Sequence, residues 1–399
     1  MRAVWNSIIA GIVFEHKTIE SLRRELRRNG ELRQVCGFDP HLGFDAVPTP
    51  RAYTNLLKAL YRCSEEVEAM FDVLVEKLKS LLPDFGKCLA IDSKAISSRA
   101  KGKNKNTKAD GRRDLDADWG VKQYSSKHQE GTLWKKVTKW FGYKLHLVVD
   151  STYEIPVAFC VTRASASDQN HLLPLLEKIS ETDPELIERG EYISADRGYD
   201  SEKNNRKLYD TYGIKPIIDI RHMWKDPDLT RPLYPERADN IIYDEDGTIF
   251  CVCPKTDQRR EMAYSGFEKD RATLKYRCPA CAYGFECKGR QFCSSNASNY
   301  GRVVRVPLET NRRLFVPVPR SSYKCRREYK KRTAIERVNS RLSEKFGFEK
   351  HTIRGMKKMR LRVGLALVVM LALAVGSIQA GRAEQMRSLV RCFPKRAVA

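Results

Sequence analysis

The stretch YKLHLVVDSTYEIPVAFCVT, residues 143–162, decides the fold because it reads as two β-strands joined by a short turn. Asp150 ends the first strand, and we expect it to form the turn before the second strand begins at Glu154. His146 alternates with leucines on the first strand, which predicts a partly exposed structural histidine. KCLAID, residues 87–92, is another short run with the pattern of a strand. Together these runs predict three neighbouring strands that open a sheet in the antiparallel sense.

Alternating helical and strand patterns follow these three strands. We expect a helix from about Gln169 to Ser180 capped by Asp168, a strand at residues 191–195, a helix at 201–212 and a strand at 214–220. The resulting order, βββαβαβ, is that of the RNase H-like arrangement. The predicted fold class is therefore α/β, with an RNase H-like core.

Changes in the periodicity of apolar residues divide the chain into five predicted parts. Helical spacing dominates the opening, strand patterns begin at Lys87, and helical periodicity disappears between about Met223 and Cys325 before it returns. A gap of this length is too long for a plain loop. The predicted parts are a helical domain (1–84), the RNase H-like core in two pieces (85–222 and 326–381), a β-rich Cys-containing insertion between them (223–325) and a basic tail (382–399).

The charge of the chain points to a polyanionic partner. Lys and Arg outnumber Asp and Glu by 73 to 50, which gives 399 residues a net charge of +23. Nucleic acid is the commonest such partner, and the alternative is a merely basic protein. The apolar run at residues 363–378 is shorter than the roughly 20 residues that a spanning helix needs. We expect a buried core helix there and no membrane, against the alternative of a single-pass membrane protein.

Two aspartates stand where strands end. Asp92 closes the apolar run CLAI, and Asp196 follows YISA directly, before Gly198 allows the chain to turn away. Ligands gather at such strand ends in α/β sheets. The alternative is that these residues only cap or form turns.

A third acid lies on a helical stripe. Tyr329, Arg332, Glu336 and Ser343 are spaced to share one face of a single helix. A different stripe is apolar and would face the core, namely Ile335, Val338, Leu342 and Phe346. Three carboxylates can hold two Mg²⁺ or Mn²⁺ ions for phosphoryl transfer, with Arg332 and Lys94 contacting phosphate. The alternative is a solvated charged face.

Four stretches resemble bacterial insertion-sequence transposases of the DDE type, in the group with a Tyr-x2-Arg-x3-Glu-x6-Lys signature. They are AIDSKAI around Asp92, SADRGYDSE around Asp196, YKKRTAIERVNSRLSEKFGFEKHTIRG at 329–355 and, for the N-terminal domain, IESLRRELRRNGELRQVCGF at 19–38. The resemblance covers nearly the whole chain and is weakest in the insertion.

The resemblance implies a mobile-element endonuclease that cuts transposon ends and joins them to target DNA. Its metal ligands would be Asp92, Asp196 and Glu336, and Tyr329 and Arg332 would touch DNA phosphate. The enzyme would bind terminal inverted repeats and target DNA as a homodimer, in the bacterial cytoplasm at the nucleoid. Alternatives are a non-catalytic or decayed transposase-derived DNA-binding protein and a structure-specific nuclease on the same core.

The signature lysine is missing, because Ser343 stands at its position. Lys345 lies on the other side of the helix, near Val338. Ser343 and Asn339 can still hydrogen-bond a phosphate, but an ionic contact is lost. Downstream, Arg354 is a candidate contact to the DNA backbone.

The insertion carries a cysteine series that could hold a structural zinc ion. The candidate ligands are Cys278, Cys281, Cys287 and Cys293, preceded by Cys251 and Cys253. Knuckle-like spacing suits tetrahedral Zn²⁺ in a reducing compartment. The alternative is a set of buried or free thiols.

Overall fold

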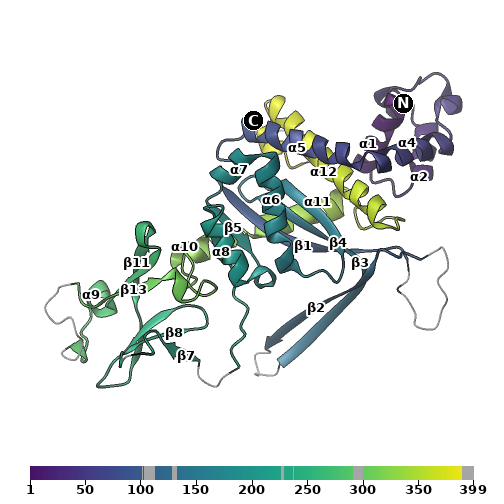
Figure 1. The fold of residues 1–399 in the computed structure, drawn as a ribbon. Helices are drawn as coiled ribbons and strands as arrows, with labels where there is room; N and C mark the ends of the chain where they lie inside the picture. The colour runs from purple at the N-terminus through teal and green to yellow at the C-terminus, as the bar shows by residue number, and fades with distance from the viewer. Residues whose placement is uncertain are drawn as a thin grey trace, which may run out of the picture.

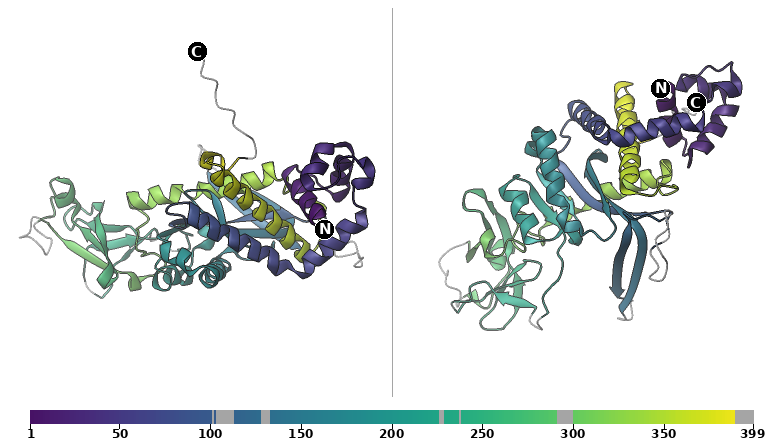
Figure 2. Two further views of the ribbon diagram at one scale, coloured as in Figure 1. Left: turned by 90° about the horizontal axis from the view of Figure 1, so that it is seen from above. Right: turned by 45° about the vertical axis from the view of Figure 1, so that its right-hand side comes forward.

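The computed structural model describes residues 1–100, 102, 113–127, 133–225, 229–236, 238–290 and 300–388. It is an elongated molecule in three parts. A bundle of N-terminal helices lies at one end, a mixed sheet with its helices lies in the middle, and a β-rich part lies at the other end (Figure 1). The view from above shows the same succession (Figure 2).

The N-terminal part is helical, as predicted. Thr18 caps one helix by accepting the Ser21 N–H, and Pro50 begins another directly after Thr49. Its helices are α1 (Arg2–Val13), α2 (Ile19–Arg28), α3 (Gly30–Cys36), α4 (Pro50–Arg62) and α5 (Ser64–Leu81).

The central sheet mixes antiparallel and parallel pairs. β1 pairs antiparallel with β3 and parallel with β5, β5 pairs parallel with β6, and β3 also pairs with β4 and β2. The strands are β1 (Cys88–Ser97), β2 (Asp118–Lys127), β3 (Leu133–Asp150), β4 (Ile155–Arg163), β5 (Tyr192–Ala195) and β6 (Lys215–Ile218). The helices between them are α6 (Leu172–Thr182), α7 (Pro184–Arg189) and α8 (Glu202–Asp210).

Sequence patterns did not predict β2 or the first half of β3. These segments form a two-stranded ribbon that leaves the body of the sheet (Figure 1). Trp, Val, Tyr and Thr alternate there with lysines, and the lysines obscured the period of two that marks a strand.

Of three predictions about single residues in and after the sheet, the structure confirms one and shows that two were wrong. Asp150 does form the turn, since its carboxylate accepts the N–H groups of Thr152 and Tyr153. The prediction for His146 was wrong, because its side chain is fully buried. Asp168 does not cap the next helix, because α6 begins at Leu172 with His171 as its N-cap. A short 3-10 turn, η2 (Asp168–Asn170), precedes that helix.

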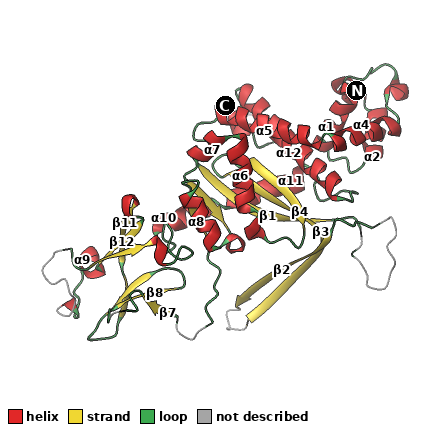
Figure 3. Cartoon of the chain, viewed as in Figure 1, coloured by secondary structure: helices red, strands yellow, loops and turns green. Residues whose placement is uncertain are grey.

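The insertion contains two small sheets with their own buried core (Figure 3). One sheet has the order β10-β9-β8-β7 and the other the order β11-β12-β13. Its elements are β7 (Thr230–Pro232), β8 (Ile241–Asp244), β9 (Ile249–Val252), β10 (Arg259–Glu261), β11 (Ala263–Glu268), β12 (Thr273–Arg277), α9 (Pro279–Tyr283) and β13 (Val303–Pro307).

Three helices follow the insertion: α10 (Tyr323–Lys330), α11 (Thr333–Lys345) and α12 (Met356–Gln379). The prediction of one helix carrying both Tyr329 and Glu336 was wrong, because α10 ends before α11 begins. Arg332 occupies the N-cap position of α11.

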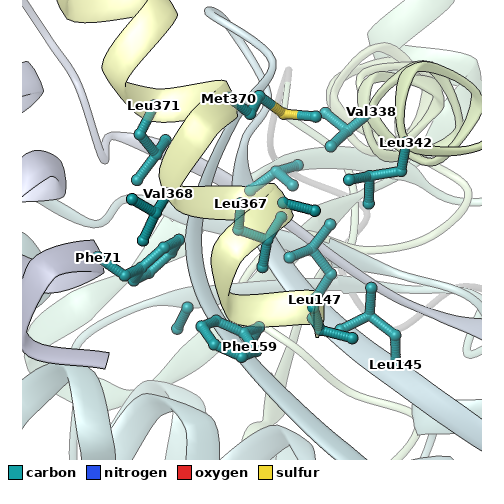
Figure 4. Close-up of a cluster of buried hydrophobic side chains, with 14 of the residues drawn as sticks. Phe71, Leu145, Leu147, Phe159, Val338, Leu342, Leu367, Val368, Met370 and Leu371 are labelled. Atoms are coloured by element: carbon teal, nitrogen blue, oxygen red, sulfur yellow. The ribbon is translucent and has the colours of Figure 1, made fainter. Parts of the chain in front are cut away.

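The apolar run at 363–378 lies in α12, which packs against α5, β4 and α11 in the main core (Figure 4). Leu367 and Met370 of α12 lie among Val338 and Leu342 of α11 and Phe159 of β4 (Figure 4). Within the described residues α12 is long and apolar enough to cross a membrane by length and composition, but 67% of its most apolar window is buried inside the protein. This burial agrees with the predicted core helix.

Candidate active site

Strand register brings Asp92 and Asp196 together. Ile91 of β1 pairs with Ala195 of β5 in parallel register, so the two aspartates occupy the next position on neighbouring strands. Adjacent strands lie about 4.8 Å apart. Asp196 accepts the Gly198 N–H at 2.9 Å, and a Cβ at Gly198 would lie 2.9 Å from the same carboxylate oxygen. Glycine therefore permits the sharp turn that presents Asp196.

The two carboxyl groups are crowded with negative charge. Burial, followed by the nearby Asp196, raises the pKa of Asp92 to about 6. Burial also raises the pKa of Asp196, and the nearby Asp168 contributes in the same direction. A site of this kind favours a bound cation, because a cation would offset the cost of two buried negative charges.

Helix α11 brings the third acid to the same edge of the sheet. Arg332 lies between the acids, with Nη2 at 2.6 Å from Glu336 Oε1 and Nη1 at 3.7 Å from Asp92 Oδ2. Glu336 is half exposed, with 52% of its side chain accessible. The arrangement therefore joins Glu336 to Asp92 through a guanidinium group.

Tyr329 belongs to α10 but remains next to Arg332. The Arg332 guanidinium carbon lies 5.7 Å from the centre of the Tyr329 ring. The ring itself packs on a small apolar cluster that includes Tyr192 of β5 and Cys325 of α10. The helix break after Lys330 thus leaves these two side chains in contact.

Lys94 and Ser343 meet on a shared partner. Lys94 Nζ lies 2.9 Å from Glu349 Oε1, and the Ser343 hydroxyl donates to the same oxygen at 3.1 Å. Lys345 instead donates to the backbone carbonyl of Arg387, away from the acids.

The remaining candidates for DNA contact lie further along the chain. Asn339 is partly buried on α11, and its side-chain oxygen has no hydrogen-bond partner. Arg354 is exposed in the turn before α12. The roles of Asn339 and Arg354 in DNA contact stay predictions.

Two polar groups near the aspartates were missed by sequence reasoning. Lys122 of β2 donates to the Ser93 carbonyl at 3.3 Å, and its charge lowers the pKa of both Asp92 and Asp196 against the larger effect of burial. Asp168 pairs with Lys144 at 2.9 Å. The β-prone residues Trp119 and Val121 just before Lys122 were the available signal, whereas nothing in the local pattern distinguished Asp168 from a helix cap.

The donor set fits a divalent metal ion in its chemistry. Asp92, Asp196 and Glu336 offer only hard oxygen ligands, which Mg²⁺ and Mn²⁺ prefer. Across the described ranges no group of three acidic, His or Cys side chains is gathered closely enough to hold an ion. Arg332 explains the spacing, because its guanidinium occupies the space between Asp92 and Glu336.

The predicted zinc ligands come together only in part. A Cβ added at Gly301 would lie 2.7 Å from Cys281 Sγ and 3.3 Å from Cys278 Sγ, so these two sulfurs are neighbours. Cys287 instead lines a pocket with Cys251 and Cys253. Cys293 lies outside the described residues. The described part of the insertion therefore brings Cys278 and Cys281 together, but it holds no three of these thiols close enough to bind a metal ion.

Comparison with known protein families assigns the chain to a family. The sequence pattern of the Transposase DDE domain family matches residues 83–372, which is most of the chain and includes all three acids. The chain therefore belongs to the DDE transposase domain family.

A more specific likeness covers a smaller segment. Over 84 residues the chain is 39% identical to a Burkholderia cepacia protein assigned as the transposase of insertion sequence element IS402. The match covers 19% of this chain and 37% of that protein.

Proposed function

We propose that this protein is a DNA transposase that cuts transposon ends and joins the freed 3′-hydroxyl to target DNA. The observation that carries the proposal is the parallel register that puts Asp92 beside Asp196, with Glu336 joined to them through Arg332. Membership of the DDE transposase domain family supports it.

The order of the strands supports an RNase H-like core. β4, β3, β1, β5 and β6 follow one another across the sheet, the first three antiparallel and the last three parallel. In this proposal residues 85–222 and 326–381 form the catalytic core, and residues 223–325 interrupt it. Residues 1–84 bind the transposon end.

Each residue at the site has a separate role in the proposed reaction. Asp92, Asp196 and Glu336 would hold two Mg²⁺ or Mn²⁺ ions, and such ions would supply activation of the attacking oxygen and stabilisation of the leaving oxygen. Arg332 balances the charge of the acids and is positioned to bind the scissile phosphate. Tyr329 packs against Arg332 and limits the orientations of its guanidinium.

The proposed partners follow from charge and from the reaction. A net charge of +23 favours a long contact with duplex DNA, both at terminal inverted repeats and at the target. Joining two ends requires two active sites, so we propose a homodimer on DNA. The same reaction places the protein in the bacterial cytoplasm at the nucleoid. A structural Zn²⁺ in the insertion is supported only by the neighbouring sulfurs of Cys278 and Cys281.

The test uses three single variants, Asp92→Asn, Asp196→Asn and Glu336→Gln, with labelled DNA that carries the sequences flanking the gene. Each variant keeps the shape of the side chain and removes one negative charge. We expect Mg²⁺-dependent cleavage to fall by at least 100-fold in each, because each loses a metal ligand. Asp84→Asn is the matched control, since Asp84 is exposed and precedes the first residue of β1.

Two results would contradict the proposal. Cleavage that survives any of the three changes would exclude the three-acid site. Binding of end DNA by the wild type without cleavage or joining at any Mg²⁺ or Mn²⁺ concentration would instead indicate a decayed transposase-derived DNA-binding protein. Cleavage without strand joining would indicate a nuclease on the same core.

A further inference from the structure

The long strand β3 belongs both to the central sheet and to a two-stranded ribbon. Its second half, from Gly142 to Asp150, pairs with β1 inside the sheet, whereas its first half pairs only with β2. We call residues 118–127 and 133–141 the β2–β3 arm. The arm projects from the body of the molecule in Figure 1 and in the right-hand view of Figure 2. An isolated two-stranded ribbon is marginally stable in water, so a free arm of this kind suggests a partner.

Register assigns the side chains of the arm to two faces. Residues that pair directly across antiparallel strands point to the same face. Lys122 pairs with Thr138, and Lys136 lies two positions before Thr138 on the same strand, so these three residues share one face, called here the inner face. Val121 pairs with Lys139 on the opposite, outer face.

The inner face begins at the catalytic acids. Lys122 reaches the carbonyl of Ser93, the residue next to Asp92, at 3.3 Å. Trp140 secures the base of the same face, because its ring covers Gly120 and its Nε1–H donates to the Tyr143 carbonyl at 3.1 Å. The inner face therefore runs outward from the proposed site of cleavage.

The charge of the arm selects its partner. The arm contains five lysines and one acid, Asp118, which lies at its base and accepts the Ser165 N–H. Two such arms from two copies of the chain would repel each other, whereas the phosphates of DNA would be attracted. A two-stranded ribbon also fits the width of the DNA major groove.

We propose that the inner face of the β2–β3 arm binds duplex DNA next to the scissile phosphate and holds the strand over Asp92 and Asp196. The inference rests on the proposed function, because the DNA is placed by the site of cleavage. In this arrangement Lys136 contacts a phosphate along the arm, and Lys122 contacts one close to the acids.

A pair of matched variants tests which face is used. Lys136→Gln and Lys139→Gln remove the same charge from exposed residues three positions apart on the same strand, but from opposite faces. DNA affinity is measured against salt concentration with end DNA that includes flanking sequence. We expect Lys136→Gln to reduce the slope of log affinity against log salt by about 0.9, the value for one lost phosphate contact, and Lys139→Gln to leave it unchanged.

A shortened arm tests the need for the ribbon. Replacing residues 123–137 with Asn-Gly joins Lys122 to Thr138 through a two-residue turn and keeps the base of the arm. We expect the shortened protein to keep its melting temperature, because Trp140 and the sheet are retained, and to lose at least tenfold in affinity for end DNA.

The outcomes separate this inference from the proposed function. If the wild type cleaves DNA and the shortened protein binds and cleaves equally well, the arm inference is wrong and the proposed function stands. Equal effects of Lys136→Gln and Lys139→Gln would overturn the assignment of the inner face. Loss of dimerisation in sedimentation with unchanged DNA affinity would assign the arm to a contact between copies. If the wild type binds DNA through the arm but does not cleave it, only the proposed function fails.

Discussion

Ser343 removes a positive charge that the family signature would place on α11, but the structure supplies one from another element. Lys94 lies on β1 two residues after Asp92 and shares Glu349 Oε1 with Ser343. The Lys94 hydrogen bond, assisted by that of Ser343, holds the pKa of Glu349 below its usual range. A lysine from the strand thus stands beside the position of the missing lysine on the helix.

Because Lys94 stands beside the position of the missing lysine, we expect a lysine at position 343 to compensate for the loss of Lys94. Lys94→Ser should reduce end cleavage by about tenfold, the equivalent of about 1.4 kcal/mol of lost stabilisation of the transition state. The double variant Lys94→Ser/Ser343→Lys should recover most of that loss, because it moves the ammonium group from β1 to α11. Single-turnover cleavage rates measure both effects. A double variant no faster than Lys94→Ser would show that the two positions are not equivalent.

His146 provides a second prediction at this scale, for the dependence of stability on pH. Burial, reinforced by the neighbouring His171, lowers the pKa of His146 to about 3. Between pH 6.5 and 3 the unfolded chain therefore binds a proton that the native state rejects, so stability is lost as pH falls through this window. The slope from this one group is at most about 1.4 kcal/mol per pH unit.

His146→Gln should flatten this slope, because glutamine can still hydrogen-bond Thr162 but does not titrate. Urea unfolding at pH 6.5, 5.5 and 4.5 gives the three free energies of unfolding that are needed. His222→Gln, at a site whose side chain is 62% exposed, is the control. Equal slopes for wild type and His146→Gln would assign the acid sensitivity to other groups.

At the scale of elements, Gly142 marks the point where β3 passes from the arm into the sheet. A Cβ there would lie 2.1 Å from the backbone oxygen of Ile96 and 2.6 Å from the backbone nitrogen of Ser98. These are backbone atoms, so no rotamer change relieves the clash. The strands can cross here only because residue 142 is glycine.

Gly142→Ala should therefore lower the free energy of unfolding by about 2 kcal/mol or more, in the range of overpacked cores. Gly376→Ala on α12 should have the opposite effect on stability, because nothing lies within 4 Å of a Cβ added at Gly376. That change should stabilise the helix by up to about 1 kcal/mol. Thermal melts of both variants test the pair, and a stable Gly142→Ala protein would mean that β1 and β3 can separate at this point.

The positions of the two aspartates could be predicted from the sequence, whereas a helix break and a long-range ion pair could not. Asp92 and Asp196 could be located because apolar runs end directly before them. The break between α10 and α11 could not, because Lys330, Lys331 and Arg332 continue the helical spacing through it. The pairing of Lys94 with Glu349 joins residues 255 positions apart and carries no local signal. Asp168 was misassigned because its tertiary partner, Lys144, outweighed its preference for a helix cap.

At the scale of the whole molecule, a single hydrophobic core contains residues of the N-terminal helix α5, of strand β4 and of the late helix α12. Phe71 of α5 meets Phe159 of β4 edge to face at 5.1 Å, beside Val368 of α12 (Figure 4). Helices α5 and α12 make the largest contact between helices. The N-terminal helices and the sheet therefore share their hydrophobic stabilisation.

Phe71→Ala should destabilise the whole protein by about 3–5 kcal/mol, because it opens a cavity in this shared core. Val73→Ala on the same helix should cost under about 0.5 kcal/mol, since Val73 is 63% exposed. Circular dichroism of the helices and tryptophan fluorescence should report one common transition in both variants. Separate transitions would show that α5 unfolds independently of the sheet.

The position of the insertion has a consequence during translation. About 140 residues separate Asp196 from Glu336, and at ordinary bacterial rates of synthesis the ribosome needs on the order of ten seconds to cross them. During this interval the nascent sheet lacks the cover of α11 and α12, and the insertion can form its own separate core. Until α11 and α12 have been synthesised, the emerging chain exposes Leu145 and Leu147, which pack in the same core as these helices in the folded protein, and the proposed site lacks Glu336.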